Sequence, residues 1–310
     1  MILAIASVAS AQPYPNKPVR IVASYAAGGG VDVMARLVAQ RLSQHFAQQF
    51  VVENRAGAGG AIGADVVAKA VPDGYTLLAG GNPELTFLPH ISEKLPYDPQ
   101  RDLAPLVLVA NAPSVVVVHP AYPAASLKEL LALAKAGDVH YGTPGRGTPM
   151  HLSFELLNAE AGTKFSHVPY KGGGPATSDV VAGQVSVAVI NAPPLLPHIK
   201  AGKLRALGLM QEERSALLPG IPTFREATGI ANIDAPAWFA FLAPAGVPAD
   251  IRTRLEQGIR QAVTDAEIQA TLATMGLDVV AIPSERFAEI IRAESNYNAR
   301  TIKRLGYRPD

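Results

Sequence analysis

The sequence predicts an α/β protein built from two lobes, and three observations support this class. The chain has 310 residues, which is enough for two domains that each bury a core. Short apolar runs of strand length alternate with segments whose apolar residues recur at helical spacing. Glycine clusters stand between several of these strands and the helices that follow, which is where α/β proteins bind ligands.

The first hundred residues show the alternation most clearly. Segments 19–23, 50–54 and 75–79 read as strands, and the apolar residues between 31 and 42 recur at helical spacing. A second helix follows the glycines of segment 57–63. This β-α-β-α-β order predicts a parallel sheet covered by helices.

A second series of strands and helices follows the break at Asn111-Ala112-Pro113. We expect strands at 107–109, 115–118, 139–142, 165–168, 185–190 and 204–209, with helices at 126–135, from about Pro149 and at 174–182. Asn191 ends one of these strands, just before an expected Pro-Pro turn.

The pattern changes at Trp238. A strand at 239–243 is followed by expected helices at 249–263, 265–274 and 284–305, with one short strand at 279–280. A tail with so little strand of its own is expected to pack on an existing sheet. We therefore predict a discontinuous lobe 1 (12–112 and 237–310) and a lobe 2 (113–236), joined by two chain crossovers that form a hinge.

The N-terminus resembles the end of a signal peptide. Residues 1–11 are mostly apolar and end in Ala9-Ser10-Ala11, a small-residue cleavage site before Gln12. The basic leader expected before such a run is missing, and the alternative is a first strand or helix. We expect export to the periplasm with cleavage near Ala11 and Gln12.

Composition excludes several classes of function. The net charge is +1, which gives no reason to expect nucleic acid as a partner. The absence of cysteine excludes disulfides, thiolate catalysis and cysteine-ligated metals. The histidines lack the spacing of a zinc site, and no nucleophile elbow or Walker sequence occurs. We therefore expect no catalytic residues, no metal and no cofactor.

The glycines Gly28, Gly29 and Gly30 separate the first strand from its helix. Such a helix start offers unpaired N–H groups and a partial positive charge to an anion. A tight structural turn is the alternative explanation for the glycines. Asp32 fits the first turn of the helix electrostatically, or it could orient waters or a ligand amine. Segment 141–148 contains a second glycine turn, expected to oppose the first across a carboxylate-binding cleft.

Other polar residues stand near the same expected sheet edges. Arg146 lies within the second turn, where it is either solvated or able to bind a ligand carboxylate. His151 follows in the first helical turn as a ligand neighbour or a packing residue. Tyr170 begins a further glycine turn, and Asn82 and Asn191 end strands, where asparagine either binds ligand or simply forms a turn.

Several motifs carry a resemblance to one family. They include Ala26-Ala27-Gly28-Gly29-Gly30-Val31-Asp32, Val52-Glu53-Asn54-Arg55-Ala56-Gly57, Pro72-Asp73-Gly74-Tyr75-Thr76-Leu77, Leu95-Pro96-Tyr97-Asp98 and Val168-Pro169-Tyr170-Lys171-Gly172. The chain resembles the substrate-binding proteins of tripartite tricarboxylate transporters, the Bug and TctC-like receptors, over nearly its whole length. The resemblance implies a type II periplasmic-binding-protein fold with two lobes, a hinge and a central ligand cleft.

In that family two glycine loops grip a ligand carboxylate. Carried over here, the loops are Tyr25–Asp32, which includes Ala27, and Thr143–His151, which includes Gly147 and Thr148. This chain departs from the family at Gly30, which replaces a hydroxyl residue, and at Arg146, which replaces a small or apolar residue. If Arg146 faces the cleft, it suggests a second carboxylate on the ligand.

The resemblance implies a monomeric receptor that binds a small mono- or dicarboxylate, aromatic or amino acids included. Such a receptor delivers its ligand to membrane transporter subunits of the tripartite type. An orphan sensor for a signalling system is the alternative, and an enzyme on a similar two-lobed fold is a third.

Overall fold

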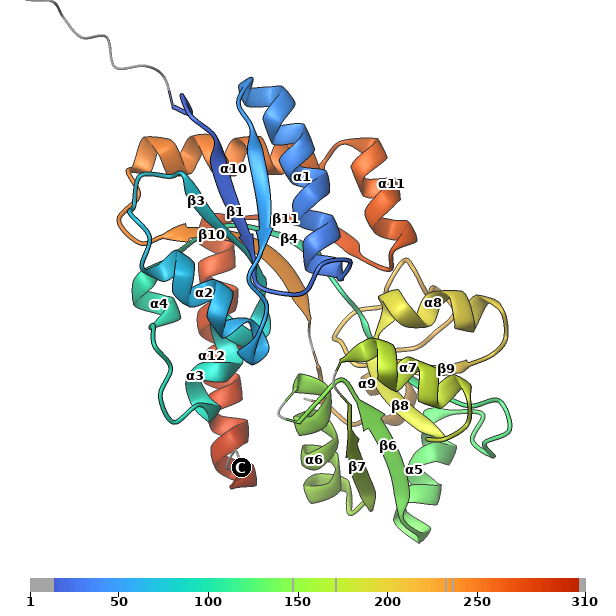
Figure 1. Ribbon diagram of the computed structural model, residues 1–310. Coiled ribbons are helices and arrows are strands. Elements are labelled where there is room, and N and C mark those ends of the chain that lie inside the picture. The colour runs from blue at the N-terminus through green and yellow to red at the C-terminus, as the bar shows by residue number, and fades with distance from the viewer. Residues whose placement is uncertain (1–13, 147, 171, 232, 236, 307–310) are drawn as a thin grey trace, which may run out of the picture.

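The structure is a computed structural model that describes residues 14–306 apart from 147, 171, 232 and 236. It contains two separate sheets, each with its own helices, and Figure 1 shows the two lobes side by side. The expected signal-peptide segment 1–11 lies outside the described residues.

Sheet A, in lobe 1, has the strand order β11-β4-β10-β3-β1-β2. Strands β1, β2 and β3 run parallel to one another, as predicted, whereas β10 pairs antiparallel with both β3 and β4. Its strands are β1 (Val19–Ala23), β2 (Phe50–Asn54), β3 (Thr76–Gly81), β4 (Leu103–Asn111), β10 (Trp238–Pro244) and β11 (Asp278–Pro283).

Helices cover both faces of sheet A because successive residues of its inner strands point to opposite faces. On β1, Ile21 belongs to one buried cluster and Val22 to another. The first cluster packs under α1 (Gly30–Phe46), α10 (Ala249–Val263) and α11 (Ala266–Thr274). The second packs under α2 (Ala61–Ala68) and α12 (Ser284–Leu305), and four short helices complete lobe 1: η1 (Ala58–Gly60), η2 (Pro83–Phe87), α3 (Leu88–Ile91) and α4 (Pro99–Asp102).

Sheet B, in lobe 2, has the order β7-β6-β8-β5-β9. Its strands are β5 (Ser114–Val118), β6 (Val139–Thr143), β7 (Phe165–Pro169), β8 (Val187–Asn191) and β9 (Arg205–Leu209). Its helices are α5 (Leu127–Ala136), α6 (Pro149–Ala161), α7 (Gly173–Val181), α8 (Ala192–Lys200) and α9 (Phe224–Thr228). Every residue of β5 is buried, because β8 and β9 flank it and helices cover both faces of the sheet.

The chain passes between the sheets twice, and the two crossovers lie together. The Ala112 N–H donates to the Ala237 carbonyl at 2.8 Å, and the Ser114 hydroxyl donates to the Ala235 carbonyl at 2.6 Å. The break expected at Asn111-Ala112-Pro113 is therefore the first crossover. Paired crossovers of this kind permit hinge motion of one lobe against the other.

A further contact joins the lobes away from the crossovers. The end of α12, from lobe 1, lies beside α6 of lobe 2 (Figure 1). Leu152 of α6 is buried against Ile302 of α12 and Phe87 of η2. An ion pair between Arg304 and Glu160 adds an exposed electrostatic contact, worth little by itself.

Most predicted elements are confirmed within one or two residues, but one expectation was wrong and two strands are longer than expected. The Pro-Pro sequence after Asn191 does not end the strand in a loop. It lies in the first helical turn of α8, where the backbone N–H that proline lacks would have no partner within the helix. The strand expected at 279–280 extends over Asp278–Pro283, because the edge of β4 gives it a pairing partner. The strand expected at 107–109 likewise spans nine residues as β4.

Candidate functional site

The two glycine turns follow β1 and β6 at the carboxyl ends of their strands. In Figure 1 the first turn of α1 points from lobe 1 towards lobe 2, and α6 begins on the side of lobe 2 nearest to lobe 1. The sheets therefore bring both helix starts to the region between the lobes.

The side chain of Asp32 holds the first glycine turn in place through hydrogen bonds. It is 2% exposed, and its Oδ2 accepts the Gly28 N–H at 2.9 Å. Its Oδ1 accepts Nδ2 of Asn54 at 2.8 Å and Nε of Arg36 at 3.0 Å. Although burial opposes it, the hydrogen bonds from Arg36, Gly28 and Asn54 hold the pKa of Asp32 below its usual range. These contacts support a structural role for the carboxylate in shaping the turn.

The glycines of the first turn meet different demands. Gly28 has φ +82°, a conformation that favours glycine. A Cβ at Gly30 would stand 2.7 Å from the ring of Phe239, so this position needs glycine for close packing. Ala27, Gly28 and Gly29 are exposed, which leaves the backbone of the turn open to a ligand.

Tyr25, at the start of the same turn, contacts an acid that the sequence did not single out. Its hydroxyl donates to Oε2 of Glu84 at 2.6 Å. Glu84 lies in η2 and is fully buried. The sequence signal that could have found it is a lone acid shortly after Gly80 and Gly81, the glycines that end a strand.

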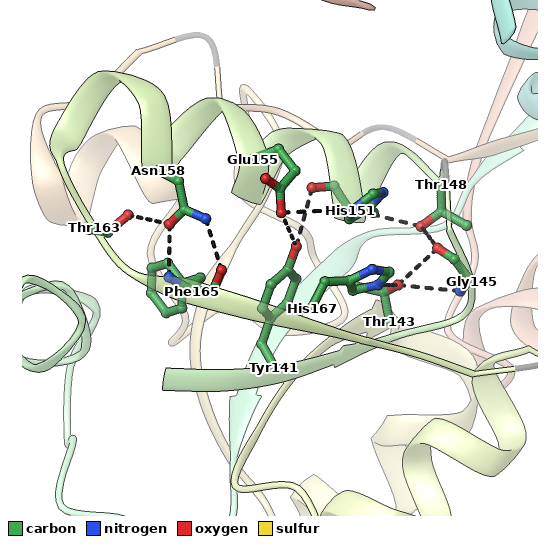
Figure 2. A network of polar contacts seen from close by, with 10 residues as sticks. All are labelled: Tyr141, Thr143, Gly145, Thr148, His151, Glu155, Asn158, Thr163, Phe165 and His167. Carbon is green, nitrogen blue, oxygen red and sulfur yellow. Dashed lines mark hydrogen bonds and ion pairs between the residues drawn. The ribbon is translucent and has the colours of Figure 1, made fainter. Parts of the chain in front are cut away.

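The second turn is held by a network of hydroxyls and imidazoles (Figure 2). Thr143 Oγ1 pairs with His167 Nε2 at 2.7 Å and donates to the Gly145 carbonyl at 3.0 Å. Thr148 is the N-cap of α6: its Oγ1 accepts the His151 N–H at 3.4 Å. Gly147 lies outside the described residues.

The buried His151 and the half-buried His167 form a pair behind this turn. Their ring centroids are 3.9 Å apart, with an angle of 21° between the ring planes. Burial, and then the charge of Arg146, lower the pKa of His151 to about 4. Burial, His151 and Arg146 lower the pKa of His167 to about 3. Both imidazoles are therefore neutral near pH 7. His167 was missed because its partner Thr143 lies on a neighbouring strand.

Arg146 is exposed, and its charge acts on both histidines by lowering the pKa of each. Tyr170, directly after β7, supports the turn: its N–H donates to the Thr143 carbonyl at 3.1 Å. The Tyr170 hydroxyl donates to Asp179 at 2.9 Å, and burial raises the pKa of Tyr170 to about 12. Arg146, Thr143, Thr148, His151 and Tyr170 thus form one group in lobe 2.

The two asparagines of the predicted site contact other parts of the protein. Asn82 is 1% exposed and donates to Oε1 of the half-buried Glu294 at 2.8 Å. Asn191 donates to the Ala112 carbonyl and to the Ser114 hydroxyl, both at 3.2 Å, and so braces the first crossover.

In the part of the chain that the structure describes, no cluster of three or more metal-ligating side chains is found. No helix of this part is long and apolar enough to span a membrane. The arrangement offers two exposed turns that begin helices, one cationic side chain and several neutral hydrogen-bonding groups. This chemistry suits an anion.

Comparisons with known proteins agree with this arrangement. The family model described as "Tripartite tricarboxylate transporter family receptor" matches residues 34–307. Protein BugT of Bordetella pertussis (strain Tohama I) is 37% identical over 285 residues, covering 91% of this chain and 87% of BugT.

Solved structures show the same fold. The periplasmic binding protein BugD has a TM-score of 0.82 at 28% identity, covering 96% of this chain and 100% of BugD. R. palustris Rpa4515 with adipate has a TM-score of 0.85 at 30% identity, covering 96% of this chain and 100% of that one. These similarities confirm the predicted periplasmic-binding-protein fold. The chain belongs to the tripartite tricarboxylate transporter receptor family, as the motifs of its glycine turns indicated.

Proposed function

We infer that this receptor binds a small mono- or dicarboxylate between its lobes and closes around it. The observation that carries the proposal is the pair of glycine turns, one from each lobe, at the starts of α1 and α6. Backbone N–H groups at such starts bind carboxylates, and hydrogen bonds to a charged group are among the stronger ones. Tyr25, Ala27, Gly28, Gly29, Gly30 and Asp32 form one half of the proposed site, and Thr143, Arg146, Gly147, Thr148, His151 and Tyr170 the other.

Hinge closure completes the proposal. Lobe 1 comprises 12–112 and 237–310, and lobe 2 comprises 113–236; the strand membership of the two sheets supports these limits. Asn191 braces the first crossover, and Asn82 holds Glu294 of α12 within lobe 1. A ligand drives closure only to the extent that it binds the closed state more tightly than the open one.

The relative Rpa4515, solved with adipate, supports a carboxylate as ligand. The family description supports delivery of that ligand to the membrane subunits of a tripartite transporter. Export to the periplasm, with cleavage near Ala11 and Gln12, places the receptor beside such subunits. The proposed receptor acts as a monomer, needs no cofactor, and binds without chemical turnover.

A thermal-shift panel tests the proposal, since a ligand that binds only the native state raises Tm. The panel contains adipate, malate, aspartate and benzoate, with hexanediol as the uncharged control for adipate. We expect at least one acid to raise Tm in a saturable manner and hexanediol to have no effect. Recovery of the acid unchanged, measured by NMR after incubation, separates binding from catalysis. An equal shift by hexanediol, or none by any acid, would contradict the proposal.

A further inference from the structure

We propose that Glu84 is a positioning residue for the first ligand turn and that it takes up a proton when a carboxylate binds there. The inference rests on the proposed function, since it concerns the same turn. It goes further by naming a residue outside both turns and a second species, the proton, that is bound with the acid.

The carboxyl of Glu84 is enclosed and bonded on both oxygens. Oε1 accepts the Ser24 hydroxyl at 2.6 Å and the Gly81 N–H at 2.9 Å. Oε2 accepts the Tyr25 hydroxyl at 2.6 Å. Ser24 and Tyr25 are consecutive residues that link the end of β1 to Gly28, so this one carboxyl fixes the entry to the ligand turn.

The surrounding backbone is shaped to admit this carboxyl. A Cβ at Gly80 would stand 2.4 Å from Oε1 of Glu84, and a Cβ at Gly60 would stand 2.6 Å from Oε2. The two glycines belong to separate elements, β3 and η1. A side chain at either one would collide with the carboxyl, so the space is fitted to Glu84.

The hydrogen bonds accommodate both protonation states. The Ser24 hydroxyl lies 3.3 Å from the Ala79 carbonyl, and the Tyr25 hydroxyl lies 3.3 Å from the Gly59 carbonyl. When Glu84 is ionised, both hydroxyls donate to it. When Glu84 is protonated, its O–H donates to one hydroxyl oxygen, and that hydroxyl turns its own hydrogen to the neighbouring carbonyl. The carboxyl and the two hydroxyls therefore keep hydrogen-bond partners in either state.

The buried surroundings of Glu84 disfavour its ionised form. Among the described residues it takes part in no ion pair; the titratable groups that face it are Tyr25, after β1, and Tyr97, whose hydroxyl donates to the Glu84 carbonyl at 2.8 Å. Asp65 of α2 lies near Tyr97 and adds negative charge. Burial raises the pKa of Glu84, and the hydrogen bonds from Ser24, Tyr25 and Gly81 only partly oppose this.

A carboxylate arriving at the turn brings a second negative charge close to Glu84. Like charges that share a site favour protonation of one of them. A proton from solvent then binds the Glu84 carboxyl, and no covalent bond forms or breaks. With Glu84 neutral, the hydrogen of the Tyr25 hydroxyl is free to turn to the Gly59 carbonyl or to an oxygen of the bound acid. Binding is therefore tighter at lower pH, down to the range where the acid itself becomes protonated.

Calorimetric titration of the full chain with adipate tests this. Titrations at one pH in buffers of different protonation enthalpy give the number of protons taken up. We expect a value of about 0.5 to one proton, with a dissociation constant that rises by the corresponding three- to tenfold per pH unit within pH 6–9. Glu84→Gln keeps a neutral group of the same shape, and it should bind adipate with no proton uptake and a flat pH profile.

Two further variants separate positioning from titration. Tyr25→Phe should weaken adipate binding by about tenfold and keep the proton uptake, because Glu84 remains. Glu294→Gln is the control: it removes a half-buried carboxyl that is likewise held by neutral donors, and it should keep the wild-type pH slope.

The outcomes distinguish this inference from the proposed function. Adipate that binds the wild-type chain without proton uptake overturns the inference alone, even if Glu84→Gln fails to fold. Uptake that survives in Glu84→Gln assigns the proton elsewhere and also overturns it. If neither adipate nor any other acid of the panel binds at any pH, the proposed function fails first.

Discussion

The imidazoles of His151 and His167 stack at 3.9 Å behind the second glycine turn, although 16 residues separate them in the chain. Both rings are held neutral, with pKa values of about 4 and about 3 against an ordinary 6.5. An unfolded chain gains protons at these histidines below pH 6.5, and the folded chain does not. Their contribution to stability is therefore complete above pH 6.5 and is lost as the pH falls.

We expect the free energy of unfolding to fall by on the order of 1–2 kcal/mol per histidine between pH 7.5 and 5. The buried acids with raised pKa, Glu84 and Glu294, change stability in the opposite direction, so the test compares variants. His167→Gln should flatten the acid side of the stability curve in urea titrations. His140→Gln, an exposed histidine on β6, should leave it unchanged. Equal slopes in the two variants would contradict this account.

Arg146 should discriminate between ligands by their second charge. Arg146→Ala is expected to weaken adipate binding by about tenfold and hexanoate binding by less than twofold, because only adipate carries a second carboxylate. Arg146→Lys should lie between, since lysine lacks the planar fork of donors. Calorimetry with the two acids, which have equal chain lengths, measures the difference. An unchanged affinity for adipate in Arg146→Ala would remove this residue from the site.

Replacing Gly28 in the first turn should impair carboxylate binding more than it impairs folding. Gly28→Ala forces an alanine into the left-handed region at a cost of about 1 kcal/mol. Gly162 offers a matched control, since its φ is +65° and, as at Gly28, an added Cβ would meet nothing within 4 Å. We expect similar losses of stability in both alanine variants, and loss of carboxylate binding in Gly28→Ala alone. Equal binding by the two would show that the turn only shapes the chain.

The contact between α12 and α6 should couple the two lobes. Ile302→Ala removes a side chain that is 6% exposed and packs with Leu152 and Phe87, so it should cost about 2–4 kcal/mol. Val71→Ala, at an exposed position, should cost less than about 0.5 kcal/mol. Chemical denaturation measures both changes. In Ile302→Ala we also expect a larger radius of gyration by small-angle scattering, and an unchanged radius would show that this contact does not hold the lobes together.

Most of the fold could be predicted from the sequence, because the periodicity of apolar residues in strands and helices is a local signal. It also predicted that the tail from Trp238 returns to the first lobe, since the tail had no sheet of its own. It missed the helix after Asn191, where two prolines suggested a turn although proline is acceptable in a first helical turn.

The site was less accessible to sequence reasoning. The glycine turns were visible, because they follow strands directly. Glu84 and His167 were not, because their partners are 59 residues away (Tyr25) and 24 residues away (Thr143). Only the folded sheets bring such pairs together, so a lone acid or imidazole in the sequence gives no sign of its neighbour.

The place of β10 in sheet A has a consequence for how the chain folds as it is made. Sheet B has all its strands once Leu209 is in place, whereas β10, which lies between β3 and β4, ends at Pro244. Pairing of Phe239 with Gly81 must close a long loop, which is slow. Lobe 2 can therefore fold first. Until β10 is made, β3 and β4 each have an unpaired edge that could pair with a strand of another chain. A nascent chain of this receptor needs protection in its N-terminal lobe until its last quarter arrives.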